Sequence, residues 1–253
     1  MKQIAAITLI GLLLAGCSGE TAPEADASAE APAYAAPPVA THVRLEAGRV
    51  VVTGRAGPDE RVRLIEMDGT AHGVTADADG AFAISLPGTG AADRLYNLSV
   101  ERAGQSVSSD GWLFSPASAP ERAVMLRPGG ASLPVGPAPL LAVVDIDSGG
   151  GVALAGVAEG GQDVSLSLDG RTVARVRADD QGRWFSVLSS AVTPGLHRLG
   201  ATAGDERDER EVDVAAIRPA GAIETAPAAD GVRVAWSLPG GGAQTTLILL
   251  PRS

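Results

Sequence analysis

Hydrophobic and polar residues alternate one by one through much of the chain from residue 42 onward. Successive side chains of a β-strand point to opposite faces, so this period buries one face and leaves the other in water. The apolar positions of this kind include Val62 and Leu64, Phe82, Ile84 and Leu86, Tyr96, Leu98 and Val100, and Val164, Leu166 and Leu168. Gly, Asp and Pro turns separate the short strands, and no helical period is evident. The pattern predicts an all-β fold made of β-sandwiches.

The pattern occurs twice, at an offset of 102 residues, so that Gly54 corresponds to Gly156 and Phe82 to Trp184. Further matched pairs are Ala56 and Ala158, Val62 and Val164, Asp77 and Asp179, and Gly80 and Gly182. An Asp-Gly pair at 68–69 recurs at 169–170, with a slip of one residue, and it suits tight hairpins because glycine tolerates a positive φ. The repeat predicts two tandem β-sandwich domains, at 42–127 and 140–218, with a Pro/Gly-rich inter-domain linker at 128–139.

The last segment, 219–253, forms a separate unit outside the repeat. Val232–Trp236 and Thr245–Leu250 are strand-like, and Pro239–Gly242 supplies a turn between them. We therefore expect a C-terminal β-hairpin, which packs on its domain because a lone hairpin is marginal in water. Gly111–Phe114 followed by Ala123–Leu126 is a weaker counterpart after the first domain.

The runs Val51–Val62 and Asp77–Phe82 resemble the bacterial Ig-like domains of surface and secreted proteins. The second copy is similar over Val152–Val164 and Ala178–Trp184, although it has Glu159-Gly160-Gly161 where that family usually has a proline. The resemblance implies two Ig-like sandwiches. It implies no reaction and no fixed ligand, since members of the family act mostly as spacers, stalks and adhesive modules.

The N-terminus has the pattern of an export signal. Lys2 supplies a positive charge, and Ile4–Leu14 is an apolar run too short to span a membrane. The sequence Leu14-Ala15-Gly16-Cys17 resembles the lipobox of bacterial lipoproteins. This resemblance implies cleavage between Gly16 and Cys17, which removes a signal peptide at 1–16, and attachment of lipid, with palmitate among the acyl chains, to Cys17.

Cys17 is the only cysteine, so it has no partner for an intramolecular disulfide in an oxidising compartment. Residues 17–41 are dominated by Ala, Pro, Glu and other small or polar residues, which cannot bury enough surface to order a chain. We expect a disordered tether there. Ser18 follows the cysteine, and among Gram-negative lipoproteins the absence of Asp at that place points to the outer membrane. The sequence leaves open whether the folded part faces the periplasm or the outside.

The charge of the chain restricts its partners. Its net charge is −10, and loss of the signal peptide removes Lys2, the only charged residue of that segment and the only lysine. This acidic balance argues against nucleic acid and anionic lipid headgroups as partners. The absence of any other lysine also excludes Schiff-base chemistry and a phosphate-loop lysine.

The sequence offers little for catalysis. The only histidines are His42, His72 and His197, they lack metal-ligand spacing, and no Gly-x-Ser-x-Gly motif is present. Asp77 with Asp79, and Asp145 with Asp147, have a weak likeness to calcium loops, but the further oxygen ligands of such loops do not follow. We expect no enzyme, no cofactor and no metal site.

The tryptophans provide the alternative to a purely structural role. Trp184 takes the place of Phe82 and is expected in a core, whereas Trp112 and Trp236 lie outside the repeats. The two form either part of a core or an exposed aromatic surface that binds glycan, peptidoglycan or a partner protein. The sequence thus predicts a non-catalytic structural or interaction lipoprotein of the bacterial envelope, held to the membrane by lipid on Cys17, with an envelope protein or glycan as a further partner.

Overall fold

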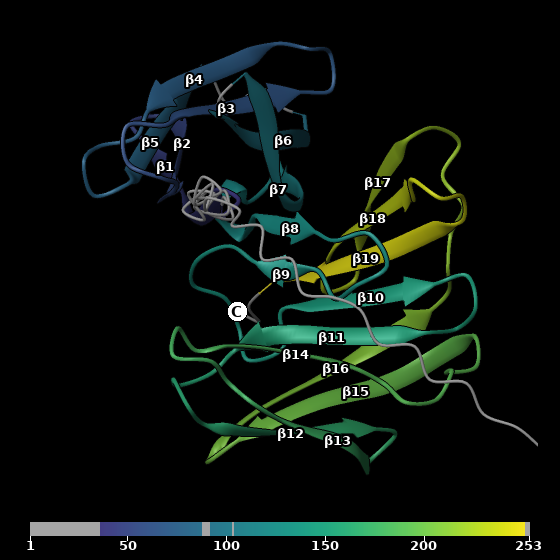
Figure 1. Cartoon of the computed structure of the whole chain (residues 1–253). Helices are drawn as coiled ribbons and strands as arrows, with labels where there is room; N and C mark the ends of the chain where they lie inside the picture. The colour runs from purple at the N-terminus through teal and green to yellow at the C-terminus, as the bar shows by residue number, and fades with distance from the viewer. Residues whose placement is uncertain (1–35, 88–91, 103, 251–253) are drawn as a thin grey trace, which may run out of the picture. The chain divides into compact units, whose positions relative to one another are not determined.

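The computed structural model describes residues 36–253 except 88–91, 103 and 251–253 (Figure 1). The predicted signal peptide, Cys17 and most of the predicted tether lie outside the described residues. No helix of the described part is long and apolar enough to cross a membrane. Its elements are β1 (Val39–Glu46), β2 (Arg49–Arg55), β3 (Arg61–Glu66), β4 (Ala71–Thr75), β5 (Ala81–Leu86), β6 (Arg94–Arg102), β7 (Gln105–Ser115), η1 (Pro120–Arg122), β8 (Val124–Leu126), β9 (Leu133–Pro134), β10 (Val143–Asp147), β11 (Val152–Val157), β12 (Asp163–Leu168), β13 (Arg171–Arg177), β14 (Arg183–Val187), β15 (Gly195–Ala203), β16 (Glu206–Val214), β17 (Ile223–Ala228), β18 (Gly231–Ser237) and β19 (Ala243–Leu249).

The strands form four antiparallel sheets. Sheet 1 has the order β1-β2-β5, and sheet 2 has the order β4-β3-β6-β7-β8-β9. Sheet 3 has the order β14-β11-β10-β19-β18-β17, and sheet 4 has the order β13-β12-β15-β16. In each copy of the repeat, the first, second and fifth strands pair in one sheet, and the fourth, third, sixth and seventh pair in the other. This is the arrangement of an Ig-like sandwich whose fourth strand pairs with the third. The predicted all-β fold with two tandem sandwiches is confirmed.

The repeated glycine and aromatic residue lie opposite each other in both sandwiches. Gly54 pairs with Phe82 across β2 and β5, and Gly156 pairs with Trp184 across β11 and β14. A Cβ on Gly156 would overlap the carbonyl oxygen of Leu140 and crowd the Trp184 ring, and a Cβ on Gly54 would meet equivalent atoms. Glycine is needed at these positions because backbone and ring approach it closely. The repeat in the sequence therefore reflects a repeated packing requirement.

The turns also follow the sequence-based expectation. Asp169 and Gly170 both have positive φ, of 50° and 79°, and connect β12 directly to β13, as expected of a two-residue hairpin turn. Asp77 accepts backbone N–H bonds from Asp79 and Ala81 through Oδ1, at 3.0 and 2.8 Å. The Asp77 carboxylate thus shapes the turn between β4 and β5.

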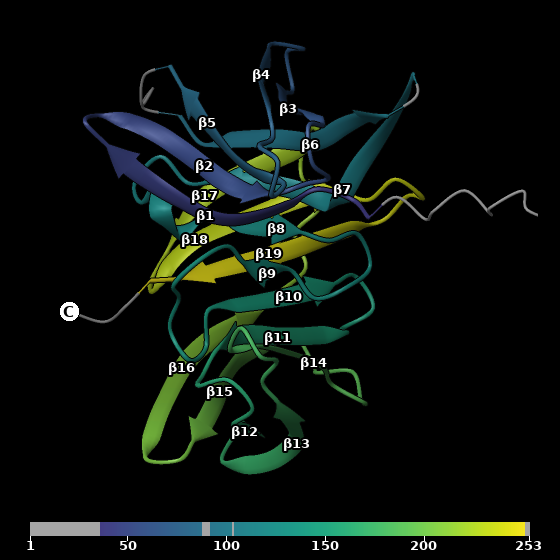
Figure 2. The ribbon, with the colours of Figure 1, turned by 60° about the vertical axis from the view of Figure 1, so that its left-hand side comes forward.

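Both sandwiches are extended beyond one edge. In sheet 2, β8 pairs with β7, and in sheet 3, β19 pairs with β10. The predicted C-terminal hairpin corresponds to β18 and β19, which pair from Gly231 with Leu249 to Ser237 with Ala243. Because β19 lies between β10 and β18, the C-terminal strands continue the sheet of the second sandwich (Figure 2). The predicted counterpart in the first sandwich is the pairing of Trp112–Phe114 with Val124–Leu126.

Three hydrophobic clusters result. One lies between sheets 1 and 2, where it includes Phe82 and Tyr96, and a second lies between sheets 3 and 4, where it includes Trp184. The third cluster joins residues of sheet 2 to residues of sheet 3, and we call it the third core. Its buried members are Phe114, Val124, Leu126, Ala142, Val143, Ala155, Val234, Trp236 and Ile248. Strands β10, β11 and β19 are therefore buried on both faces, and β19 buries even its polar residues Gln244, Thr245 and Thr246.

Two predicted boundaries differ from the structure in detail. Strand β1 begins at Val39, within the segment expected to be tether, and Ala40 is only 7% exposed. Composition hid this start because Pro, Val and Ala continue there from the preceding run. Segment 128–139, predicted as a linker, contains β9 and is packed into the fold. Its buried residues are Ala131, Ser132, Pro134 and Val135.

Candidate functional site

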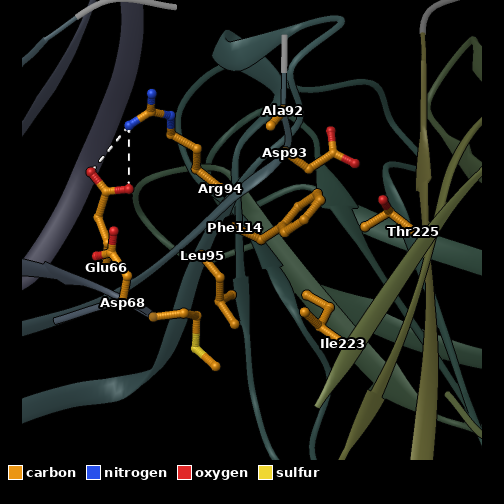
Figure 3. A pocket seen from close by; sticks show the side chains of 10 residues that line it. Glu66, Asp68, Ala92, Asp93, Arg94, Leu95, Phe114, Ile223 and Thr225 are labelled. Atoms are coloured by element: carbon orange, nitrogen blue, oxygen red, sulfur yellow. Dashed lines mark hydrogen bonds and ion pairs between the residues drawn. The ribbon is translucent and has the colours of Figure 1, made fainter. Parts of the chain in front are cut away.

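An open groove with a volume of about 690 Å³ lies between sheet 2 and the outer strand of sheet 3, β17 (Figure 3). We call it the β17 groove. The side chains that line it are Glu66, Met67, Asp68, Ala92, Asp93, Arg94, Leu95, Phe114, Ile223 and Thr225. The groove is a continuation of the space between the two sheets that the third core fills, since Phe114 belongs to that core and Leu95 and Ile223 pack against it.

The floor of the β17 groove is apolar because it is made by the strands that enclose the third core. Leu95 and Phe114 are cross-strand partners on β6 and β7. Ile223 faces them from β17, as Figure 3 shows. Met67, in the turn after β3, is 54% exposed and adds an apolar side chain to the rim. An extended apolar ligand would find a preformed surface here.

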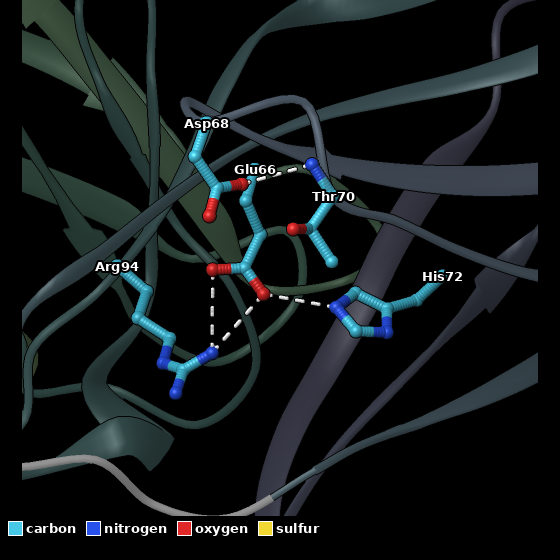
Figure 4. A network of polar contacts seen from close by, with 5 residues as sticks. All are labelled: Glu66, Asp68, Thr70, His72 and Arg94. Atoms are coloured by element: carbon cyan, nitrogen blue, oxygen red, sulfur yellow. Dashed lines mark hydrogen bonds and ion pairs between the residues drawn. The ribbon is translucent and has the colours of Figure 1, made fainter.

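One side of the rim is a polar network centred on Glu66 (Figure 4). Glu66 Oε1 lies 3.1 Å from Arg94 Nη1 and 2.9 Å from His72 Nε2. The second sandwich lacks this network, since Leu168 takes the place of Glu66 and Ala174, opposite Leu166, takes that of His72. The Ig-like fold does not require the network, because the second copy forms without it.

Two further carboxylates make the rim acidic. Asp68 Oδ1 accepts the backbone N–H of Thr70 at 2.8 Å, and this hydrogen bond holds the pKa of Asp68 below its usual value. Asp93 Oδ1 accepts the backbone N–H of Ala117 at 2.8 Å. With Glu66 they give three carboxylates against the one guanidinium of Arg94 among the lining residues. The groove therefore favours cationic groups at its edge.

The tryptophans proposed for binding are placed beside this groove but do not line it. Trp236 is 4% exposed, pairs with Ile223 across β18 and β17, and donates from Nε1 to Thr246 Oγ1 at 3.2 Å. Trp112 is half-buried and packs against the third core. Of the two alternatives for Trp236, core and exposed surface, the structure therefore has the core, because the ring fills the space between two facing sheets. Trp184 lies in the core of the second sandwich, as expected.

His197 lies within reach of a threonine and an aspartate, an arrangement that superficially matches a catalytic triad. Its Nδ1 lies 2.8 Å from Asp169 Oδ2, and its Nε2 lies 2.9 Å from the backbone carbonyl of Thr193 and 3.4 Å from that residue's hydroxyl. Both close partners are acceptors, so the two hydrogen bonds form together only when both ring nitrogens carry a proton. The hydrogen bond to Asp169 raises the pKa of His197. Because both nitrogens face acceptors within the fold, His197 has no free nitrogen placed to take a proton from a substrate.

Asp145 is the most deeply buried carboxylate of the described residues with a shifted pKa, and it is 4% exposed. Its Oδ2 accepts the backbone N–H of Ser132 at 2.5 Å. Its Oδ1 accepts from Ser132 Oγ, Gln244 Nε2 and Thr246 Oγ1, at 2.9, 2.9 and 2.6 Å. Burial raises the pKa of Asp145, and these hydrogen bonds oppose the shift. The weak calcium likeness of Asp145 thus has a structural explanation, since its oxygens join segment 128–139 to β19.

The predicted lipidation site is not part of the described structure. Gly16 and Cys17 lie outside the described residues, so lipidation stays a prediction. No group of three or more His, Cys, Asp or Glu side chains in the described part of the chain is placed to hold a metal ion. The β17 groove itself was not predicted from the sequence. Two features of the sequence could have indicated it. One is Pro227, which lies within a strand, and the other is the polar pair Glu66 and His72, which has no counterpart in the second copy of the repeat.

No family model and no curated protein matches the chain. A solved structure described as "Biofilm associated protein - BSP domain" matches 71% of this chain and 30% of its own length, with 14% identity and a TM-score of 0.24. The "D0-D1 domain of Intimin" matches 69% of this chain and 95% of its own, with 10% identity and a TM-score of 0.25. The chain thus spans less than a third of the first of these structures.

Proposed function

We propose that this chain is a lipid-anchored, non-catalytic interaction protein of the bacterial cell envelope. In this proposal the lipid is attached to Cys17, the segment after it is a tether, and the two sandwiches are the part that contacts other envelope components. The lipobox-like sequence before Cys17 supports the anchor. The acidic charge and the Ig-like architecture support a protein that contacts other envelope components and does not bind nucleic acid.

The third core is the observation that carries the proposal for the folded part. It joins sheet 2 to sheet 3 through buried residues such as Phe114 and Trp236, and Asp145 adds buried hydrogen bonds to the connecting segment. Polar groups that could suggest catalysis, including His197, are engaged in structural hydrogen bonds. What the described residues present to a partner is a groove with an apolar floor and an acidic rim.

The anchor is tested by expressing the full chain in a Gram-negative host with radioactive or alkyne-tagged palmitate. We expect the wild-type protein to incorporate the label, to be processed before Cys17 and to sediment with the outer membrane. Cys17→Ala should yield an unlabelled, unprocessed or soluble species, while Ser18→Ala should behave like wild type. A wild-type protein without label, or a labelled Cys17→Ala variant, would refute the anchor.

A second candidate function, glycan or peptidoglycan binding by aromatic side chains near Trp112 and Trp236, is less well supported. Sugar recognition by stacking needs an exposed ring, and Trp236 is buried. Trp112 is half-buried against the third core. The nearby β17 groove supports a protein partner better, because it borders a strand edge.

A further inference from the structure

The outer edge of β17 presents backbone groups to the β17 groove. Strand β17 is the last strand of sheet 3, and its partner is β18. The backbone N–H of Ser237 donates to the carbonyl of Ala222 at 2.9 Å, which makes 222 and 237 a hydrogen-bonded pair. Because such pairs alternate in an antiparallel ladder, Glu224 and Ala226 also bond to β18. The N–H and C=O groups of Ile223 and Thr225 therefore point away from β18.

Pro227 follows the same alternation. It occupies an outward position, so its missing N–H removes no bond to β18. A proline on an edge strand also limits pairing with other chains. The next outward position of β17 after Thr225 is Pro227, which has no backbone N–H to donate. Ile223 and Thr225 are thus the residues of β17 that present both an N–H and a C=O outward, and both line the groove.

We propose that the β17 groove binds an extended segment of a partner protein that adds to sheet 3 as a further antiparallel or parallel strand beside β17. This inference rests on the proposed role as an interaction protein and specifies the class of partner. Main-chain hydrogen bonds to Ile223 and Thr225 supply part of the affinity in this mode, and pockets for alternate side chains supply specificity.

The side chains around the groove define the chemistry of that segment. Alternate residues of an added strand would point to the same face as Ile223, toward Leu95 and Phe114, and apolar side chains fit that floor. The residues between them would point to the face of Glu224, which is exposed. Since Asp68 and Asp93 also lie on the rim, Lys or Arg fits both the far face and the entrance. The expected ligand alternates apolar and basic residues.

Charge also distinguishes this partner from two occupants supplied by the chain itself. Segment 18–35 contains Glu20, Glu24, Asp26 and Glu30 and no basic residue, so its charge is unfavourable in an acidic groove. A second copy that paired through its own β17 would bring a further Glu224 to the site. A basic segment of a different protein is therefore favoured over both.

The test uses the mature chain with Cys17→Ser, which stays free of lipid, and a set of fluorescent ten-residue peptides of alternating Lys and Val, Leu or Phe. Fluorescence polarisation should show saturable binding that weakens with salt, and no binding of peptides with Glu in place of Lys. Thr225→Pro removes one outward N–H and should weaken binding at least tenfold, whereas Thr225→Val keeps that N–H and should bind as tightly as the parent chain. Thermal unfolding of both variants should match that of the parent, because neither change removes a bond to β18.

Failure to bind any Lys peptide in preference to its Glu counterpart would overturn the proposal. Equal binding by Thr225→Pro and the parent chain would also overturn it, because the strand edge would then not be used. If the parent chain self-associates and Thr225→Pro abolishes this, the occupant of the groove is a second copy of the chain, and the proposal of a partner protein is overturned. None of these results affects the palmitate test, so failure of the groove and failure of the anchor are distinguishable.

Discussion

The carboxylate of Asp145 accepts hydrogen bonds from both the backbone N–H and the hydroxyl of Ser132, at 2.5 and 2.9 Å. Ser132 is fully buried in the segment between the sandwiches, and Asp145 lies on β10 in the centre of sheet 3. The same carboxylate binds Gln244 and Thr246 on β19. One buried acid thus joins the connecting segment, the second sandwich and the C-terminal strands.

Replacing Asp145 should lower the stability of the fold even when the new side chain has the same shape. In Asp145→Asn, one acceptor oxygen becomes an amide that faces donor groups, so at least one buried donor loses its partner. We expect the free energy of unfolding to fall by about 2–4 kcal/mol. Urea unfolding followed by tryptophan fluorescence measures the change. The control is Asp147→Asn, at an exposed site where the retained oxygen can still accept from Gly149 and Gly151, and it should lose less than about 1 kcal/mol. Equal effects of both variants would contradict the account of Asp145.

The close approach at Gly156 predicts a large effect of a single methyl group. In Gly156→Ala, the Cβ would overlap the Leu140 carbonyl and press on Trp184, so strands must shift. We expect a loss of about 2–3 kcal/mol in the free energy of unfolding. Thermal denaturation should report it as a lowered midpoint.

Gly240→Ala is the matched control for this change. A Cβ on Gly240 meets no atom within 4 Å, and the residue has no positive φ. Its stability should stay within about 0.5 kcal/mol of wild type. A Gly156→Ala protein as stable as this control would show that the repeated glycine is not required by packing.

The pair of His197 and Asp169 predicts a specific pH dependence. The hydrogen bond to Asp169 raises the pKa of His197 in the folded state above its ordinary value of 6.5. The interaction therefore contributes its full stabilisation below pH 6.5 and loses it as pH rises through the folded-state pKa. Urea unfolding between pH 5.5 and 8.5 should show this decline in the wild type and a reduced decline in His197→Gln. Identical pH profiles of the two proteins would contradict a stabilising contact between protonated His197 and Asp169.

The stabilisation from Asp169 also depends on pH, but in a lower range. The backbone N–H of Arg198 and the ring of His197 both donate to its carboxylate and lower its pKa. The stabilisation from Asp169 is present above its ordinary value of 3.8 and is lost as pH falls through the lowered folded-state value. The pair should therefore stabilise the fold most strongly in mildly acidic solution.

Local patterns were enough to predict the sandwiches. The features that predicted them involve only neighbouring residues and adjacent strands. They are the alternation at Val62 and Leu64, the repeated Gly54 and Gly156, and the Asp-Gly turns. Each of them depends on contacts within one copy of the repeat. They could be read because the side-chain period of a strand and the backbone demands of a turn are visible in the sequence itself.

The third core and the β17 groove depend on pairing between distant residues, which local patterns do not specify. Strand β19 pairs with β10 across about a hundred residues, for example at Thr246 and Asp145. Until that pairing is known, neither the burial of Asp145 nor the outward direction of the Thr225 N–H can be derived.

The central claim is that segment 128–139 is built into the fold and joins the two sandwiches through the third core. Hydrogen–deuterium exchange of the mature chain, read by mass spectrometry on peptides that cover this segment, tests it most directly. The N–H of Ser132 bonds to Asp145 and that of Val135 bonds to the carbonyl of Ala123. The account predicts that these amides exchange orders of magnitude more slowly than those of an unfolded chain. Exchange across the whole segment at the rate of an unstructured peptide would contradict it.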